Sequence, residues 1–171
     1  MQTYLGYKFT FNAPRVQDIH IEDIAHSLAL QCRFKGHVKD FYSVGDHCLF
    51  VLSKANHKLW GLMHEAAETY MSDIITPFKY HWRWRSYLKR MENRILKVVA
   101  KKYNLPWPIP KEIHEIDQRM WATEQRDLRC SPQSTNIKPY PERIVPTADW
   151  RTVKAVFLNQ FETLMCLRHT G

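Results

Sequence analysis

RSYLKRMENRILKVVAKKY, at residues 85–103, contains the most regular helical pattern in the sequence. Its apolar residues recur at the three- and four-residue spacing of one helix face, whereas lysines and arginines occupy the other face. The apolar positions are Leu88, Met91, Ile95, Val98 and Val99. The proline-rich residues 105–110 end the pattern, because proline cannot continue a helix. We therefore predict an amphipathic helix over residues 85–103.

Five further segments show a helical spacing of apolar residues. They span residues 22–34, 44–57, 59–71, 111–128 and 148–167. The second follows Ser43-Val44-Gly45-Asp46, which resembles a capping box and places His47 in the first helical turn. Tyr7 to Phe11 instead alternates with period two, which is typical of a short strand or an extended arm. We therefore expect an all-α domain with a short extended N-terminal arm.

The size and composition of the chain indicate one globular domain over residues 1–171. Of the 171 residues, 44% are hydrophobic, 25% are charged and only 5 are glycine, which excludes disordered and fibrous classes. The apolar runs are too short to span a bilayer, and the first residues lack the layout of a secretory signal. We therefore expect a cytoplasmic protein with no membrane partner, in which the proline-rich residues 131–146 form a surface loop.

The net charge indicates which classes of partner the protein could bind, and the spacing of the cysteines indicates their chemical state. A formal net charge of +8 favours a polyanion, which includes nucleotides, nucleic acids and membrane surfaces. The 4 cysteines are scattered and form no Cys-x-x-Cys pair, so we expect them to be reduced and mostly packed. Basic and aromatic side chains are interspersed over residues 79–90. This pattern is typical of a surface that binds nucleic acid, but it also occurs at the start of an amphipathic helix. We favour the helix and do not expect a nucleic-acid partner, because nothing else matches a nucleic-acid fold.

His64-Glu65-Ala66-Ala67-Glu68 is the stretch best suited to chemistry. On a helix, Glu68 lies near both His64 and Glu65, because residues three and four apart share a face. A mononuclear metal site combines neutral imidazoles with carboxylates and takes further ligands from other helices. His47 and Asp117 can supply them. A single histidine on a helix is more often a hydrogen-bonded or surface residue than a ligand, so the prediction rests on the whole set.

Together with their neighbours, these residues give the chain a resemblance to the HD-domain phosphohydrolases over nearly its full length. The resemblance is to the small bacterial and phage branch, which includes 5'-deoxynucleotidases and deoxynucleoside triphosphate triphosphohydrolases. Several motifs in family order are more specific than any single motif. The matching stretches are residues 21–28, Cys32-Arg33-Phe34, Phe41-Tyr42-Ser43-Val44, residues 62–68, Asp73-Ile74 and residues 117–124.

The resemblance implies an HD-domain helical bundle that binds one divalent cation, such as Zn²⁺, Co²⁺, Mn²⁺ or Mg²⁺, with room for an additional Mg²⁺ beside the phosphates. The ligands that it implies are His47, His64, Glu65 and Asp117. The family has His-Asp where this chain has His64-Glu65, so the ligand is longer by one methylene but keeps its carboxylate. His37 is the alternative to His47. We prefer His47 because the family's first ligand follows a Tyr-Ser-Val sequence closely, and because a helix holds a ligand more rigidly than a loop does.

The resemblance also implies which side chains meet the substrate. Arg33 and Lys79 would bind phosphate, because cations are needed where negative charge gathers during phosphoryl transfer. Phe34 would pack on the sugar or base, and Pro77 would line the base pocket. If His37 is not a metal ligand, it would meet the substrate's phosphates.

Two acidic residues would perform the acid–base chemistry: Glu68 would orient or deprotonate the attacking water, and Asp73 would position that water or the phosphate. The expected substrate is a deoxynucleoside triphosphate, with dATP leading, which is cleaved to deoxynucleoside and triphosphate. Such an enzyme would remove dATP in phages whose genomes contain 2-aminoadenine. The alternatives are hydrolysis of deoxynucleoside monophosphates and, in another class, binding of nucleotide or nucleic acid without turnover. The family commonly forms dimers or hexamers, so we expect a homo-oligomer.

Overall fold

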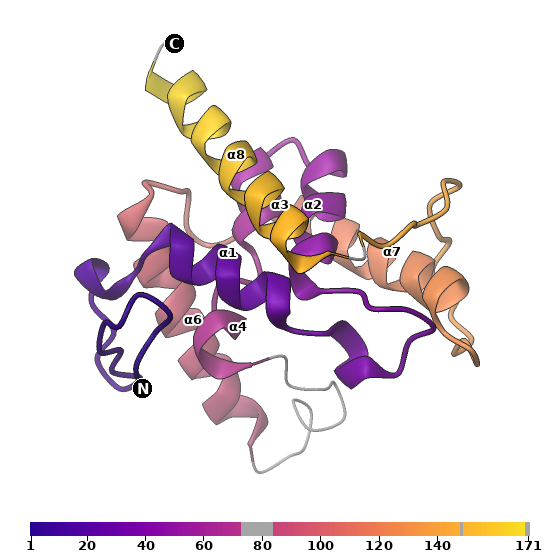
Figure 1. Cartoon of the computed structure of the whole chain (residues 1–171), viewed down its shortest axis with the longest axis horizontal. Coiled ribbons are helices and arrows are strands. Elements are labelled where there is room, and N and C mark those ends of the chain that lie inside the picture. Colours follow the sequence, from indigo (N-terminus) through magenta and orange to yellow (C-terminus); the bar gives the residue numbers. More distant parts are fainter. Residues whose placement is uncertain (73–83, 148, 170–171) are drawn as a thin grey trace.

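The computed structural model describes residues 1–72, 84–147 and 149–169, and this part of the chain is helical without a β-strand (Figure 1). The prediction of an all-α fold is thus confirmed. The helix α2 lies at the centre of the arrangement, since it packs against α1, α3, α7 and α8. The helices are α1 (Ile21–Leu30), α2 (Val44–Lys54), α3 (Lys58–Met63), α4 (Glu68–Met71), α6 (Arg85–Lys102), α7 (Lys111–Leu128) and α8 (Trp150–His169).

The main apolar core forms where the helices turn their apolar faces toward one another. The helix α6 contributes the predicted face, with Ile95 and Val99 fully buried, and α8 contributes Phe157. Burying one such side chain stabilises the fold by about 1.5–3 kcal/mol. The lysines and arginines of α6 remain mostly exposed, as the pattern over residues 85–103 predicted.

A second, smaller core lies between α2, α7 and the loop of residues 131–146. It contains Tyr42, Val51, Met120, Leu128 and Ile144. The loop is held by Arg126, whose guanidinium donates to two of its backbone carbonyl oxygens. This small core matters for the site described below, because it buries the Tyr42 ring completely with its hydroxyl toward α7.

Two close helix contacts and one cap fix the position of α2. Ser43 and Asp46 form the predicted capping box, in which the Asp46 N–H donates to Ser43 Oγ at 2.9 Å. A Cβ atom at Gly45 would lie 2.8 Å from Val153 of α8, and one at Gly61 would lie 2.9 Å from the Leu52 Cα atom. These glycines therefore let α8 and α3 approach α2 more closely than a larger residue allows.

Several predicted boundaries differ from the structure. The helix predicted over residues 59–71 is interrupted after Met63, and helical turns resume as α4 at Glu68. The helix predicted over residues 22–34 ends at Leu30, so Arg33 does not lie at its end. It lies instead in a 3-10 turn, Arg33–Gly36. The N-terminal arm forms an isolated bridge between Gln2 and Lys8 instead of a strand.

The burial of the cysteines differs in part from the prediction. Cys48 is buried and Cys32 half-buried, but Cys130 and Cys166 are exposed, so the prediction of mostly packed cysteines is wrong for these two. Cys130 follows the end of α7, and Cys166 lies in the exposed last turns of α8. None of the helices in the described ranges combines the length and the apolar character needed to cross a membrane.

Candidate metal centre

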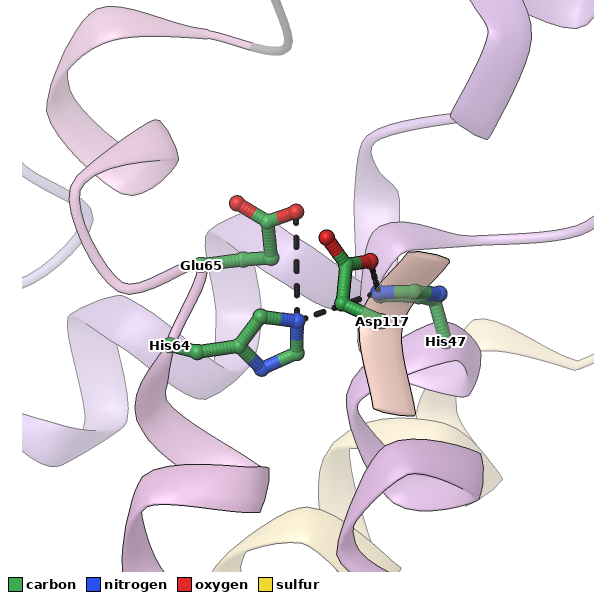
Figure 2. Close-up of side chains that lie close together, drawn as sticks. All are labelled: His47, His64, Glu65 and Asp117. Carbon is green, nitrogen blue, oxygen red and sulfur yellow. Dashed lines mark hydrogen bonds and ion pairs between the residues drawn. The ribbon is translucent and has the colours of Figure 1, made fainter. Parts of the chain in front are cut away.

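Two histidines and two carboxylates from separate parts of the chain meet in one cluster (Figure 2). His47 comes from the first turn of α2, His64 and Glu65 follow directly after α3, and Asp117 comes from α7. One ligand atom from each of the four lies within 4.8 Å of the others, so the cluster could hold a metal ion. The structure therefore brings together all four residues that the sequence singled out, including His47 in place of its alternative His37.

The two imidazole rings of the cluster turn the same nitrogen toward each other. His47 Nε2 lies 3.1 Å from His64 Nε2 and 3.2 Å from Asp117 Oδ1. The Nδ1–H of His64 donates to the backbone carbonyl oxygen of Gly61 at 2.9 Å. Because a carbonyl oxygen can only accept, this bond fixes the proton on Nδ1 and leaves the His64 Nε2 lone pair directed into the cluster.

The orientation of His47 depends on a residue to which the sequence assigned no role. Glu124 is fully buried on α7, and its Oε1 atom lies 2.6 Å from His47 Nδ1. The same oxygen accepts the Tyr42 hydroxyl at 2.9 Å, and Oε2 accepts Arg33 Nε at 3.0 Å. Glu124 lies about two helical turns after Asp117, and this spacing is the sequence feature that points to the same helix face.

Arg33 lies beside the cluster, and only 9% of the residue is exposed. Its two terminal nitrogens are 3.7 Å from Glu65 Oε1 and 3.8 Å from Asp117 Oδ1. Burial lowers the pKa of this guanidinium, but Glu124, Asp117 and Glu65 outweigh that effect and raise the pKa well above its usual value. A permanent positive charge therefore faces two of the candidate ligands.

The protonation of the cluster follows from burial and from these neighbours. Burial and Arg33 lower the pKa of His47, but Glu124 and Asp117 outweigh them and raise that pKa to about 9. Burial lowers the pKa of His64. Burial raises the pKa of Asp117, but its hydrogen bond to His47 and the nearby positive groups hold the pKa far below its usual range. In the absence of a cation, a proton on His47 therefore balances part of the carboxylate charge.

A cleft of about 610 Å³ opens beside the cluster. His64, Glu65 and Asp117 line it, together with Glu68, which is 3% exposed at the start of α4. Its other sides come from α6, from the turn before α7 and from the first turns of α7. These sides include Arg85, Lys89, Glu92, Asn93, Leu96, Trp107, Pro108, Ile109 and His114.

The helix α3 fixes the turn that carries Trp107. Trp60 of α3 donates its indole N–H to the carbonyl oxygen of Pro106 at 2.7 Å, and its ring lies 6.2 Å from the ring of Trp107. No functional role of Trp107 or His114 was predicted from the sequence. Their closeness to the cluster depends on how the turn before α7 folds over α3, which helical periodicity does not reveal.

The remaining substrate residues named from the sequence lie in different places. The guanidinium groups of Arg33 and Arg129 each lie 5.4 Å from the ring centroid of Phe34, and Phe34 is not among the side chains that line the cleft. His37 is exposed at the end of the 3-10 turn and does not belong to the cluster. Three further residues, Asp73, Pro77 and Lys79, lie outside the described residues.

These observations define an all-helical protein with a buried cluster of histidines and carboxylates that could hold a metal ion. The chain is 39% identical to the uncharacterized protein YfdR of Escherichia coli (strain K12), over 98% of this chain and 97% of YfdR. This similarity shows that the chain belongs to the family of YfdR. An uncharacterized protein of Rhodobacter capsulatus is 35% identical over 63% of this chain and 60% of its own length. No protein-family model matches the chain.

Proposed function

We propose that this protein is a metal-dependent phosphohydrolase that acts on deoxynucleotides. The single observation that carries the proposal is the convergence of His47, His64, Glu65 and Asp117 at the edge of a cleft that also contains Glu68. The cluster supplies ligands for one divalent cation, and Glu68 supplies a nearby acid–base group. A deoxynucleoside triphosphate, with dATP leading, is the proposed substrate, and this choice rests on the sequence resemblance alone.

The chemistry of the cluster fits a divalent cation. Two imidazole nitrogens and two carboxylates form a mixed nitrogen and oxygen donor set, which suits Zn²⁺, Co²⁺ or Mn²⁺ and, less closely, Mg²⁺. Around the site, the carboxylates of Glu65, Asp117 and Glu124 outnumber the guanidinium of Arg33. When bound, a divalent cation would neutralise phosphate oxygens and make water a stronger nucleophile at neutral pH.

Glu68 is positioned to exchange a proton with water in the cleft. It follows His64 by four residues and Glu65 by three, and all three side chains line the same cavity. A carboxylate there accepts the proton of an attacking water and returns it to the leaving oxygen. Asp73, which stays a prediction, would assist in placing the water.

Arg33 provides the positive charge for the phosphate. Its terminal nitrogens face Glu65 and Asp117, the two carboxylates of the cluster, so an anion that binds at the cluster comes within reach of the guanidinium. A fixed guanidinium stabilises the charge that develops on phosphate oxygens during transfer.

The cleft supports a substrate of nucleotide size. Its volume of about 610 Å³ is within the range of about 300–1,000 Å³ that is usual for small-molecule sites. The lining combines the cations Arg85 and Lys89 on α6 with the aromatic ring of Trp107. Positive charge favours phosphates and an aromatic ring favours a base, so both parts of a nucleotide find suitable chemistry.

The test is hydrolysis of deoxynucleoside mono- and triphosphates by the purified chain, supplied with each of Zn²⁺, Co²⁺, Mn²⁺ and Mg²⁺. We expect activity with at least one cation, a loss of at least about 100-fold for Glu68→Gln, and wild-type activity for Glu115→Gln, an exposed glutamate of α7. Orthophosphate from monophosphates would instead favour the 5'-deoxynucleotidase. Equal rates for Glu68→Gln and the wild type would overturn the mechanism.

A further inference from the structure

Glu124 has three hydrogen-bond donors on one carboxylate, and all of them are buried. His47 Nδ1 and the Tyr42 hydroxyl share Oε1, at 2.6 and 2.9 Å, and Arg33 Nε binds Oε2 at 3.0 Å. The Glu124 side chain is fully enclosed, as are His47 and Tyr42. A buried carboxylate with several donors around it is held in one orientation, and in turn it fixes the orientation of the donors.

The first consequence concerns the imidazole of His47. A carboxylate accepts hydrogen bonds, so the contact with Glu124 places a proton on Nδ1 and directs Nε2 toward His64 and Asp117. The other imidazole of the cluster is oriented by a backbone carbonyl, that of Gly61. His47 is therefore the ring whose orientation depends on a replaceable side chain.

The second consequence concerns Arg33. This residue begins a 3-10 turn in which Phe34 and Lys35 have φ angles of 56° and 54°, so no regular helix holds it. The bond from Nε to Glu124 leaves the two terminal nitrogens to face Glu65 and Asp117. Each oxygen of Glu124 thus orients a different group: Oε1 a candidate metal ligand and Oε2 a candidate phosphate-binding cation.

We propose that Glu124 is a positioning residue that holds His47 for the cation and Arg33 for the phosphate, and so couples the binding of the two. The proposal rests on the proposed function for the role of Arg33 toward phosphate, whereas its claim about His47 concerns cation binding alone. Glu124 touches neither ligand; it acts through the two side chains that do.

The test compares variants whose contacts with the site differ by one group. Glu124→Gln keeps the size of the side chain, but its amide nitrogen cannot accept a hydrogen bond, so either His47 or Arg33 loses its partner. Tyr42→Phe removes the third donor and leaves the other two. Glu112→Gln changes another glutamate of α7 that also contacts a histidine, but at the surface.

Co²⁺ is the probe for the cation, followed by its visible absorption and by calorimetry, and inorganic phosphate is the probe for the anion on the Co²⁺-loaded chain. We expect Glu124→Gln to weaken Co²⁺ binding by about 10–100-fold, to change the Co²⁺ spectrum and to weaken phosphate binding further. Glu112→Gln should bind Co²⁺ and phosphate much as the wild type does. Tyr42→Phe, which leaves the bonds of Glu124 to His47 and Arg33 in place, should lose less affinity than Glu124→Gln does. Circular dichroism separates these effects from unfolding.

Wild-type affinities for both probes in Glu124→Gln would overturn the proposal. Weakened Co²⁺ binding with unchanged phosphate binding would overturn the coupling. Failure of the proposed function is distinguishable, because a wild-type chain that binds Co²⁺ and phosphate but hydrolyses no nucleotide still gives every readout of this test. A wild-type chain that binds no Co²⁺ would overturn both proposals.

Discussion

Two histidine–glutamate contacts join the α2–α3 region to α7, and their geometry is nearly the same. His47 Nδ1 lies 2.6 Å from Glu124, and His57 Nδ1 lies 2.5 Å from Glu112. The first pair is fully buried. In the second pair, 52% of the histidine side chain and 25% of the glutamate side chain are exposed.

The difference lies in the surroundings of each pair. Glu112 also accepts the backbone N–H of His57 and the side-chain amide of Asn56, so it fixes the start of α3 at the surface, where solvent screens charge. Glu124 shares its oxygens with Arg33 and Tyr42 and directs the other ring nitrogen of His47, Nε2, into a cluster of ligands. A histidine–glutamate contact therefore indicates a metal site only when the pair is buried and further candidate ligands lie beside it.

The largest expected effect separates the two pairs by stability. Glu124→Ala leaves the buried Arg33 without its closest partner, so the free energy of unfolding should fall by about 3–5 kcal/mol. Glu112→Ala should change it little, because water replaces the lost contacts. Urea unfolding of both variants measures the difference, and an equal loss in the two would mean that the buried pair stabilises the fold no more than the surface pair does.

The next effect concerns cation binding. Asp117→Ala removes a candidate ligand, so we expect the affinity for Co²⁺ to fall at least about 100-fold. This is more than the usual loss when a residue that only contacts a ligand is replaced. His57→Ala should leave that affinity unchanged, because its ring belongs to the surface pair. Calorimetric titration gives both values, and similar affinities for the two variants would remove Asp117 from the ligand set.

Asp127, near the C-terminal end of α7, is a further carboxylate of this helix that is surrounded by hydrogen-bond donors. Burial raises the pKa of Asp127, but Arg126, the Ile144 N–H and Arg143 outweigh it and lower the pKa to about 2. A lowered folded-state pKa means stability that is present above about pH 4 and lost as the pH falls toward 2. Asp127→Asn should cost about 1.5–3 kcal/mol at pH 7, and its unfolding free energy should decline less than that of the wild type over this acidic range.

The last effect, and the smallest when it is counted per pH unit, is the pH dependence of cation binding. The pKa of His47 is raised to about 9, so at lower pH the ring holds a proton on Nε2 that a cation must displace. The affinity for Co²⁺ should therefore rise with pH, by up to about tenfold per unit, and level off above about pH 9. Proton release measured by calorimetry in two buffers provides the check, and binding that is independent of pH between 6 and 8 would contradict it.

The sequence predicted those parts of the fold that depend on local spacing. The apolar face over residues 85–103 and the capping box of Ser43 and Asp46 are both present. The interruption after Met63 was not predictable, because residues 64–67 keep helical apolar spacing while their backbone bonds tighten. Ala66 N–H, for example, donates to Met63 O. Apolar periodicity shows which face of a helix is buried, but it does not report such a local change in the backbone hydrogen bonds.

The four clustered side chains of the candidate site could be predicted from the sequence, but the residues that surround them could not. His64, Glu65 and Asp117 stand in motifs that the resemblance singled out, His47 closely follows another of them, and the four side chains meet in space. Glu124 ended one of those motifs without a role, because a carboxylate on a helix gives no sign of which donors surround it. The positive φ of Phe34, whose ring is not among the side chains that line the cleft, is rare for residues other than glycine and leaves no trace in composition.

Cation-dependent hydrolysis of a deoxynucleotide is tested most directly with dATP. The products formed with and without the best activating cation are separated by anion exchange. We expect deoxyadenosine and triphosphate from the wild-type chain, in amounts that fall to background after chelation of the cation and in Glu68→Gln. A chain that binds the cation at its cluster, yet forms no product from any deoxynucleoside mono- or triphosphate, would not be a phosphohydrolase of deoxynucleotides.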